Sequence, residues 1–300
     1  MYTNIYAQTL PAFVTKPAFD EQILLSKDPS FPKISVVTPS FNQAEYLERT
    51  ILSVLNQNYP NLEYIILDGG STDGSVEIIK KYEKYLHHWV SQKDKGQTDA
   101  INRGLKMATG EWLTFQNSDD VFAQNAFSTL VKAIKKHPKV NVFFGNFLFI
   151  DEHDHTYEIM KSVPFSVYAQ VYEGIQVHNQ SFFFKKSICE QLGYFDEQYT
   201  FAFDYEIMAR WGGHPSVKTH LINELWGGFR VHSTAKSSTI SQTGLREHEH
   251  IKQRYHAQLK PVWPEKVLYY YIRIRKLVYF LLTDFGYLQY RNQLKQQTNA

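Results

Sequence analysis

The stretch GEWLTFQNSDD, residues 110–120, joins an apolar run to two adjacent carboxylates. The run from Trp112 to Phe115 has the length and composition of a buried strand. Ligands of open α/β sheets bind at the carboxyl ends of strands, and Asp119 and Asp120 follow the end of this one. Paired carboxylates are hard oxygen ligands that suit Mg²⁺ or Mn²⁺. The same spacing also fits an acidic turn that caps the next helix, because Asp is a favoured N-cap residue.

Strand-like and helix-like patterns alternate around this stretch. Short apolar or β-branched runs predict further strands, at 34–38, 64–67, 89–91 and 142–150. Apolar residues at helical spacing between the strands predict helices, at 47–55, 76–82, 98–108 and 127–134. This βαβ order is typical of α/β folds, in which helices flank a central, mostly parallel sheet.

The pattern is looser at the two ends of the chain. We expect strands at 180–184 and 226–232, a helix at 204–211 and a helical extension over 244–300. Residues 1–31 hold three prolines and little periodicity, which indicates an irregular arm that lies on the domain.

Size and composition favour a globular protein with a sizeable core, since the 300 residues are 43% hydrophobic and 21% charged. A net charge of +2 argues against nucleic acid as a partner. The single cysteine, Cys189, excludes an internal disulfide and a cysteine-rich zinc site, and its helix-like surroundings favour a buried thiol. We find no signal peptide and no apolar run of about 18 residues, so we expect a cytoplasmic protein without a classical membrane span.

Polar loops follow three of the predicted strands, at 38–42, 68–75 and 117–120. In a parallel sheet these loops open on one edge, where we expect the chemistry. Asp68 can accept a hydrogen bond from a nucleobase, although a glycine-rich turn in which Asp73 caps the next helix fits as well. The chain has neither G-x-G-x-x-G nor G-x-x-x-x-G-K-[ST], so neither a dinucleotide fingerprint nor a P-loop is supported.

The segment from Asp94 to Gly104 places several polar groups at the start of a predicted helix. Asp94 is a candidate ligand of a nucleoside, and Arg103 either faces phosphate or pairs with a neighbouring acid. The alternative is an ordinary capped amphipathic helix that buries its apolar side.

Asp204 and His232 are the candidates in the second half of the chain. Asp204 opens a predicted helix, so it is either an N-cap or a general base that takes a proton from an acceptor hydroxyl. The helix dipole would keep this carboxylate ionised. His232 follows a strand and precedes a Ser/Thr/Lys loop, and it can close a cation site begun by Asp119 and Asp120. His178 lies beside apolar residues and is the weaker metal candidate.

Residues 267–290 combine Leu, Tyr, Val and Phe with Arg273, Arg275 and Lys276. This composition fits an interfacial helix that contacts the inner membrane peripherally, at its cytoplasmic face. It also fits a helix that packs on the protein's own core or on a second subunit in a homo-oligomer. The clustering of the charges in the middle of the segment favours this second interpretation.

The motifs together resemble those of family 2 glycosyltransferases with the GT-A fold, over about residues 33–238. The resemblance rests on the order and spacing of five motifs: Thr38–Asn42, Asp68–Asp73, Asp94–Gly104, Asn117–Asp120, and Asp204 before Tyr205-Glu206. It implies transfer of a sugar from a nucleotide-sugar donor with inversion at the anomeric carbon. The GT-A domain would span 32–243, with a nucleotide-binding half over 32–120 and an acceptor half over 121–243.

The resemblance also implies roles for individual residues. Asp204 would be the catalytic base, and Asp119, Asp120 and His232 would hold Mn²⁺ or Mg²⁺ on the diphosphate. Asp68 and Asp94 would hold the nucleoside. The full set expected to bind the donor is Thr38, Pro39, Ser40, Asn42, Asp68, Asp94, Gly96, Asp99, Arg103, Asn117 and Ser118.

Two positions depart from the family pattern. Asn117 stands where the family has Asp, which removes one negative charge, so metal affinity would lean on Asp120 and His232. Phe203 stands where an acid precedes the base, so Asp204 lacks a neighbour that would raise its pKa.

We therefore expect a metal-dependent inverting glycosyltransferase that uses a UDP-, GDP- or dTDP-sugar. Its acceptor would be a hydroxyl of a glycan or lipid-linked glycan, in the synthesis of lipopolysaccharide, capsule or exopolysaccharide. Asn117 and Phe203 keep open the alternative of a non-catalytic nucleotide-sugar-binding module. A protein that acts by docking its tail on a membrane is another alternative. A sugar-1-phosphate nucleotidyltransferase fits poorly, because Thr38–Asn42 is not a glycine-rich, arginine-containing loop.

Overall fold

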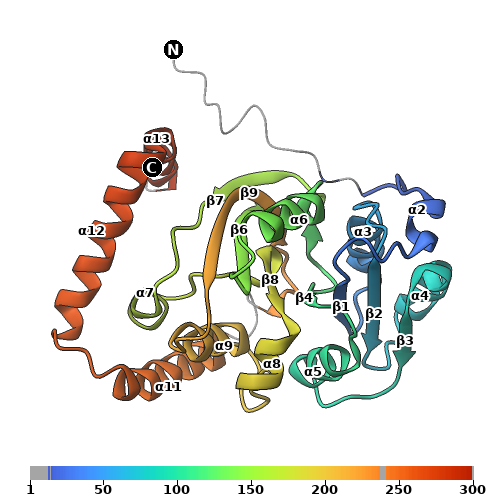
Figure 1. The fold of residues 1–300 in the computed structure, drawn as a ribbon, viewed down its shortest axis with the longest axis horizontal. Coiled ribbons are helices and arrows are strands. Elements are labelled where there is room, and N and C mark those ends of the chain that lie inside the picture. Colours follow the sequence, from blue (N-terminus) through green and yellow to red (C-terminus); the bar gives the residue numbers. More distant parts are fainter. Residues whose placement is uncertain (1–12, 14, 237–240, 299–300) are drawn as a thin grey trace.

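The first half of the chain forms the parallel part of one twisted sheet (Figure 1). The computed structural model describes residue 13, residues 15–236 and residues 241–298. The strand β1 pairs in parallel with β2 and β4, and β2 pairs in parallel with β3. These strands are β1 (Ile34–Ser40), β2 (Leu62–Asp68), β3 (His88–Ser91) and β4 (Trp112–Phe115). The helices between them are α3 (Ala44–Leu55), α4 (Ser75–Tyr82), η1 (Glu83–Tyr85) and α5 (Gln97–Met107).

The second half extends the same sheet in the order β4-β8-β6-β9-β5, and β7 pairs with β6. The strands β6 and β9 are parallel, whereas β8 is antiparallel to both of its neighbours. The strands are β5 (Val121–Phe122), β6 (Val142–Ile150), β7 (Thr156–Met160), β8 (Phe182–Lys185) and β9 (Thr219–Arg230). The helices are α6 (Ala126–Lys136), α7 (Val167–Tyr172), η2 (Asn179–Ser181), α8 (Lys186–Leu192) and α9 (Phe203–Gly212). The expected fold class, an α/β sheet flanked by helices, is confirmed.

Both faces of the sheet are buried, because successive side chains of a strand point to opposite faces. Val37 joins a core on the face covered by α5, while Val36 joins the core beneath α3 and α6. Gly104 lets α5 approach closely, since a Cβ atom there would lie 2.4 Å from a methyl carbon of Val37. Burial on both faces explains why these strands read as nearly continuous apolar runs.

The expected helical extension consists of α11 (Ser241–Leu259), α12 (Glu265–Thr283) and α13 (Phe285–Thr298). The interpretation of 267–290 as one helix is wrong, because the chain breaks at Asp284, whose φ of −159° is not helical. Asp284 pairs with Lys161 and accepts a hydrogen bond from the Tyr287 N–H, which starts α13. No helix in the described part of the chain is both long enough and apolar enough to traverse a bilayer.

The arm before β1 carries one short helix, α2 (Glu21–Ser26), which sequence periodicity did not predict. Asp20 caps it by accepting from the Gln22 N–H. The arm lies on the domain, because the N–H groups of Ala18 and Asp20 donate to the side chains of Asn56 and Asn58. Residues 1–12 and 14 lie outside the described residues.

Candidate active site

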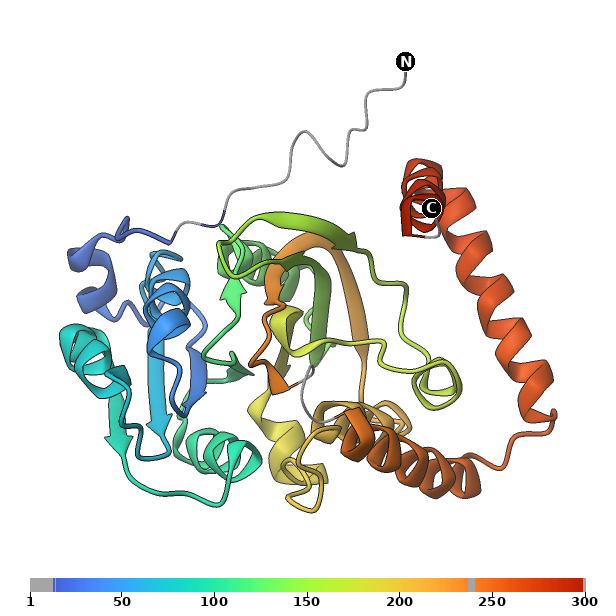
Figure 2. The same cartoon turned by 180° about the vertical axis from the view of Figure 1, so that it is seen from behind.

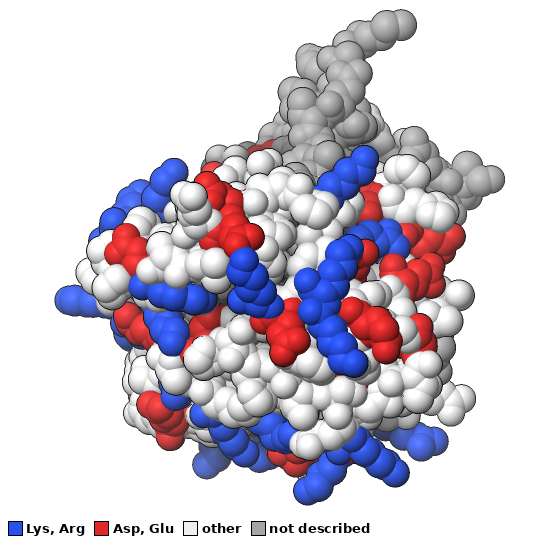
Figure 3. Space-filling view, turned by 90° about the vertical axis from the view of Figure 1, so that its right-hand side faces the viewer, with Lys and Arg blue, Asp and Glu red and all other residues white. Residues whose placement is uncertain are grey.

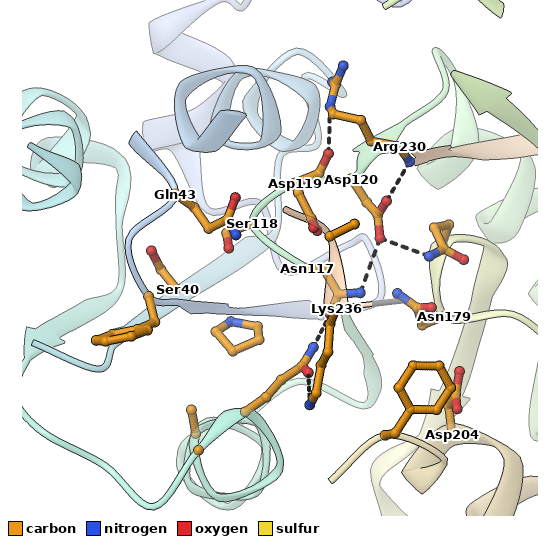
Figure 4. Close-up of a pocket in the computed structure, with 18 of the residues that line it drawn as sticks. Ser40, Gln43, Asn117, Ser118, Asp119, Asp120, Asn179, Asp204, Arg230 and Lys236 are labelled. Atoms are coloured by element: carbon orange, nitrogen blue, oxygen red, sulfur yellow. Dashed lines mark hydrogen bonds between the residues drawn. The ribbon is translucent and has the colours of Figure 1, made fainter. Parts of the chain in front are cut away.

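A cavity of about 990 Å³ lies where the ends of β1 and β4 face α9 and the segment that follows β9. Asp119 and Asp120 lie on one side of it and Asp204 lies on another (Figure 4). Both halves of the chain therefore contribute to one site. Nine of the residues predicted from sequence line the cavity: Pro39, Ser40, Asp94, Gly96, Asn117, Ser118, Asp119, Asp120 and Asp204.

The loops after β1 and β2 are bonded to each other. Asn42 donates its N–H to the Ser71 hydroxyl and accepts from the Thr72 N–H. The carboxylate of Asp68 accepts from the N–H groups of Gly70 and Ser71 and from the hydroxyls of Ser71 and Ser91. Asp68 therefore shapes its own loop, and neither it nor Asn42 is among the residues that line the cavity.

Other predicted donor-binding residues also lie behind the cavity wall. Thr38 is fully buried, and its hydroxyl lies 3.1 Å from the Tyr64 hydroxyl. Arg103 lies 3.9 Å from the carboxylate of Asp99, which is the pairing with a neighbouring acid that the sequence left open. Asp94, by contrast, lines the cavity, where its carboxylate accepts from the Gly96 N–H at 2.8 Å. Among the predicted nucleoside ligands, Asp94 is thus the accessible one.

The two adjacent carboxylates have different surroundings. Asp120 is 1% exposed, and it accepts from the N–H of Arg230 and from the side chains of Gln180 and Asn117. Burial and the neighbouring charge of Asp119 raise its pKa well above the usual range. Asp119 keeps a side-chain exposure of 21%. Its Oδ2 lies 3.2 Å from Nε2 of His232, a buried residue that is not among those lining the cavity, so His232 stands behind Asp119 in the cavity wall.

The pair formed by Asp119 and His232 fits a divalent cation. Ligand atoms on adjacent corners of an octahedron around Mg²⁺ are about 3 Å apart, given bonds of about 2.1 Å. The separation of 3.2 Å matches that spacing, and a carboxylate oxygen with an imidazole nitrogen is an acceptable ligand set. No cluster of three or more His, Cys, Asp or Glu suited to a metal occurs among the described residues. Substrate phosphate and water would therefore supply most ligands, as is common for such ions.

Asp204 lies in the first turn of α9, one residue after its first residue, Phe203, so it is not the N-cap. One carboxylate oxygen accepts from the Tyr205 N–H at 2.8 Å. Burial raises the pKa of Asp204 to about 6, even though this hydrogen bond and the charge of Lys236 lower it. Burial thus raises the pKa of Asp204 without the acidic neighbour whose place Phe203 takes.

Sequence reasoning missed several polar residues that line the cavity. Lys236 donates to Oε1 of Gln97 at 3.0 Å and to the carbonyl of Thr200, so it links the two halves. The Asn179 amide nitrogen was also missed; it is buried and, like the hydroxyl of the predicted residue Ser40, has no hydrogen-bond partner within the described structure. The Ser/Thr/Lys loop after His232 was the sequence signal for Lys236. Nothing in the sequence distinguished Asn179 from ordinary polar residues.

Aromatic side chains form the rest of the wall. Phe147, Phe149 and Phe229 line the cavity, with Phe149 packed edge-on against both of the others. His178 packs on Phe147 at 4.5 Å, and burial with the charge of Lys276 lowers its pKa to about 4. A neutral histidine packed on an aromatic ring agrees with the expectation that His178 is the weaker metal candidate.

Comparison with known sequences gives a family match over more than half of the chain. The model of "Glycosyl transferase family 2" matches residues 35–195. An uncharacterized glycosyltransferase of Mycobacterium tuberculosis is 32% identical over 183 residues, which are 60% of this chain and 69% of that protein. The putative teichuronic acid biosynthesis glycosyltransferase TuaG of Bacillus subtilis is 41% identical over 92 residues, 30% of this chain and 36% of TuaG. The chain spans only 21% of GlyA of Streptococcus pneumoniae, which is 31% identical over 147 residues.

Solved structures share the fold. S. aureus TarS in complex with UDP-GlcNAc superimposes with a TM-score of 0.60 at 17% identity, over 79% of this chain and 69% of that one. The mannosyltransferase PcManGT of Pyrobaculum calidifontis, in complex with GDP-Man and Mn²⁺, gives a TM-score of 0.54 at 17% identity, over 76% and 65%. At this level of identity the similarity establishes the architecture alone.

Proposed function

The chain belongs to glycosyl transferase family 2, and from its cavity we infer that it moves a sugar from a nucleotide-sugar donor to an acceptor hydroxyl with inversion. The observation that carries this proposal is that Asp119 and Asp204 line one cavity, contributed by opposite halves of the chain. Inversion needs a single in-line displacement, with the base and the leaving group on opposite sides of the reacting carbon. Asp204 would serve the side of the attacking hydroxyl, and Asp119 the side of the leaving diphosphate.

On the acceptor side, Asp204 would take the proton of the attacking hydroxyl as the new glycosidic bond forms. Its raised pKa supports this role, because a carboxylate with a pKa of about 6 is a stronger base than an ordinary one yet is mostly ionised at neutral pH. The aromatic wall around Phe147 and Phe229 offers apolar faces on which an acceptor sugar ring can pack.

On the donor side, Asp119 and His232 would hold the diphosphate through Mn²⁺ or Mg²⁺. The bound cation supplies positive charge where the leaving diphosphate gains negative charge. Lys236 is a further cationic group at the cavity and would bind the same phosphates. Ser40 and Asn179 offer buried polar atoms for hydroxyls of the transferred sugar. Asp120, bonded by three N–H donors, would hold the loop that presents Asp119.

The donor would be a UDP-, GDP- or dTDP-sugar, and the acceptor a hydroxyl of a surface glycan such as lipopolysaccharide, capsule or exopolysaccharide. The complexes of TarS with UDP-GlcNAc and of PcManGT with GDP-Man support nucleotide diphosphate recognition by this fold. The name of TuaG supports a role in cell-surface glycan synthesis.

The test is a panel of nucleotide sugars, each with Mn²⁺ or Mg²⁺, in assays of donor hydrolysis and of donor binding by calorimetry. We expect one nucleotide class to bind, and its turnover to stop when EDTA removes the metal. Failure of every donor both to bind and to turn over would exclude this function.

A further inference from the structure

An exposed apolar surface runs along α12 and the turn before it. Among the described residues, 21 large hydrophobic side chains are exposed, and 12 of them lie between residues 262 and 285. They include Trp263, Tyr270, Tyr271 and Ile274, which are 49–60% exposed, and Leu282, which is 81% exposed. Soluble proteins rarely leave an apolar surface of this extent without a partner.

The exposure does not come from a loosely attached helix, because α12 is anchored to the body by its inner side. Leu268, Ile272 and Phe280 are buried, at spacings that place them on one face. Arg275 donates to the carbonyl of Pro164 at 2.6 Å, and Lys276 lies 3.6 Å from the carboxylate of Glu173. α12 is the outermost element on its side of the molecule in Figures 1 and 2.

The charges on this segment have one predominant sign. Residues 260–283 contain five basic side chains and a single acid, Glu265, which pairs with Lys252. Lys260, Lys266 and Arg273 are exposed beside the apolar residues. The face around α2 and α4, at the opposite end of the molecule, carries interspersed basic and acidic side chains instead (Figure 3).

We propose that α12 docks on the surface of an anionic lipid bilayer, with its exposed apolar side chains in the interface and its basic residues on the lipid headgroups. Trp and Tyr are enriched at that depth of a bilayer, and Lys and Arg bind anionic headgroups. A second copy of the chain is the poorer partner. A symmetric contact sets the same basic residues of both copies close together, at an electrostatic cost that anionic lipid avoids.

The position of α12 gives this docking a consequence that rests on the proposed function. α12 packs on α7, and the chain that leaves α7 supplies Ile175 and His178 to the cavity wall. The Lys276 side chain is close enough for its charge to act on His178. Docking of α12 would therefore keep this side of the cavity close to the membrane surface. We assign this side to the acceptor. An acceptor sugar carried on a membrane lipid would reach Asp204 from there.

The experiment is co-sedimentation of the full-length chain with vesicles of phosphatidylcholine alone or with phosphatidylglycerol. We expect binding to the anionic vesicles that weakens with salt. The double substitution Ile274→Glu/Leu282→Glu should reduce it by about tenfold or more, since each apolar side chain kept out of the interface costs at least that factor. The matched control is Leu245→Glu, because Leu245 is 69% exposed on α11, outside the segment.

Three results would overturn the docking. The first is that the protein does not bind anionic vesicles at low salt. The second is that the double variant binds them as well as the wild type. The third is that the wild type is a dimer in light scattering, the double variant is a monomer, and neither protein binds vesicles. Donor hydrolysis in solution separates this proposal from the proposed function. If the protein hydrolyses the donor but does not bind vesicles, only the membrane docking is wrong. If it binds vesicles but neither binds nor turns over any donor, only the proposed glycosyl transfer is wrong.

Discussion

Burial sets the chemistry of Asp204 at the residue scale. Because burial raises its pKa to about 6, a substantial fraction of the carboxylate is protonated just below neutral pH. Only the ionised form accepts a proton, so we expect kcat to fall about tenfold per pH unit below about 6 and to level off above it. The measurement is transfer rate against pH at saturating donor and metal. A rate independent of pH between 5 and 8, with chemistry rate-limiting, would contradict the assignment of the base.

His232 carries a second prediction at this scale. Its Nε2 lies 3.2 Å from Asp119, so His232→Gln should remove one of the two proposed protein ligands and weaken Mn²⁺-dependent nucleotide binding by about 10–100-fold. Calorimetry with nucleotide and Mn²⁺ measures the change. The control is His153→Gln, which should bind nucleotide and Mn²⁺ normally, because the His153 side chain is 71% exposed and does not line the cavity. Unchanged affinity in His232→Gln would place the cation elsewhere.

Sequence reasoning found residues whose chemistry and strand-end position coincide. Asp119 and Asp94 belong to this class, Asp204 was found by its place at the start of a helix, and all three line the cavity. It could not separate Asp119 from Asp120, or Asp94 from Asp68, because the difference lies in how many donors the fold brings to each carboxylate: Asp120 accepts three hydrogen bonds and Asp68 accepts four. Such bonds depend on tertiary structure. The same limit hid Lys236, whose partners lie far away in sequence.

At the scale of elements, α11 positions the start of α9. Glu247 on α11 accepts from the N–H groups of Thr200, Phe201 and Ala202, the residues just before this helix. These bonds lower the pKa of Glu247, although its burial opposes them. We infer that Glu247 is a positioning residue, since it fixes the turn that carries Asp204.

Glu247→Ala should therefore lower kcat by about tenfold or more with little change in donor KM, because small displacements of a catalytic group are costly. Glu247→Gln keeps one acceptor oxygen and should recover part of the rate. Glu249→Ala, on an exposed side of the same helix, serves as the matched control in the kinetic assay. A proportional loss of kcat and stability in all three variants would instead indicate a merely structural role.

The edge of β7 shows how an added helix protects a sheet. β7 pairs with β6 on one side. On its other side the N–H groups of Ile159 and Lys161 donate to the hydroxyls of Tyr290 and Tyr287, both from α13. Unpaired strand edges invite association with other chains, and α13 blocks this one.

Tyr287→Phe and Tyr290→Phe should each lower the free energy of unfolding by about 1–3 kcal/mol, because an N–H group, partly buried at Lys161 and buried at Ile159, loses its acceptor. Hydrogen exchange at Ile159 and Lys161 gives the direct measurement, and we expect faster exchange in the corresponding variant. Tyr270→Phe is the control, since Tyr270 is 57% exposed on α12. Equal protection in wild type and variants would show that the tyrosines do not hold the edge.

Sequence patterns predicted the elements of the first half more completely than those of the second. The strands β1, β2 and β4 are buried on both faces, so each reads as an apolar run. β9 starts at Thr219, seven residues before its predicted start at Trp226. The sequence does not indicate these first residues as strand, because they are partly exposed and form no apolar run. β7 was missed for the same reason, as most of it is partly exposed. Tertiary contacts with α13 and β6 stabilise it instead.

At the scale of the whole molecule, one sheet carries two half-sites. The parallel part presents the loop with Asp119, and the mixed part presents Asp204 and the segment with His232 and Lys236. The bond from Lys236 to Gln97 joins the two across the cavity. The order of the motifs along the chain was enough to predict this fold and the pairing of acids. The sequence could not predict that the apolar side chains of α12 are exposed, because the exposure of a helix face depends on what packs against it.

The central claim is that Asp204 acts on the acceptor while the opposite side of the cavity binds the donor. The most direct measurement is donor binding and sugar transfer on the same preparation of Asp204→Asn, with Mn²⁺ and the active nucleotide sugar. We predict donor affinity within about twofold of the wild type and a transfer rate lower by about 10²–10⁴-fold, the usual contribution of a general base. Transfer within a few-fold of the wild-type rate, or loss of donor binding in a folded variant, would contradict the account.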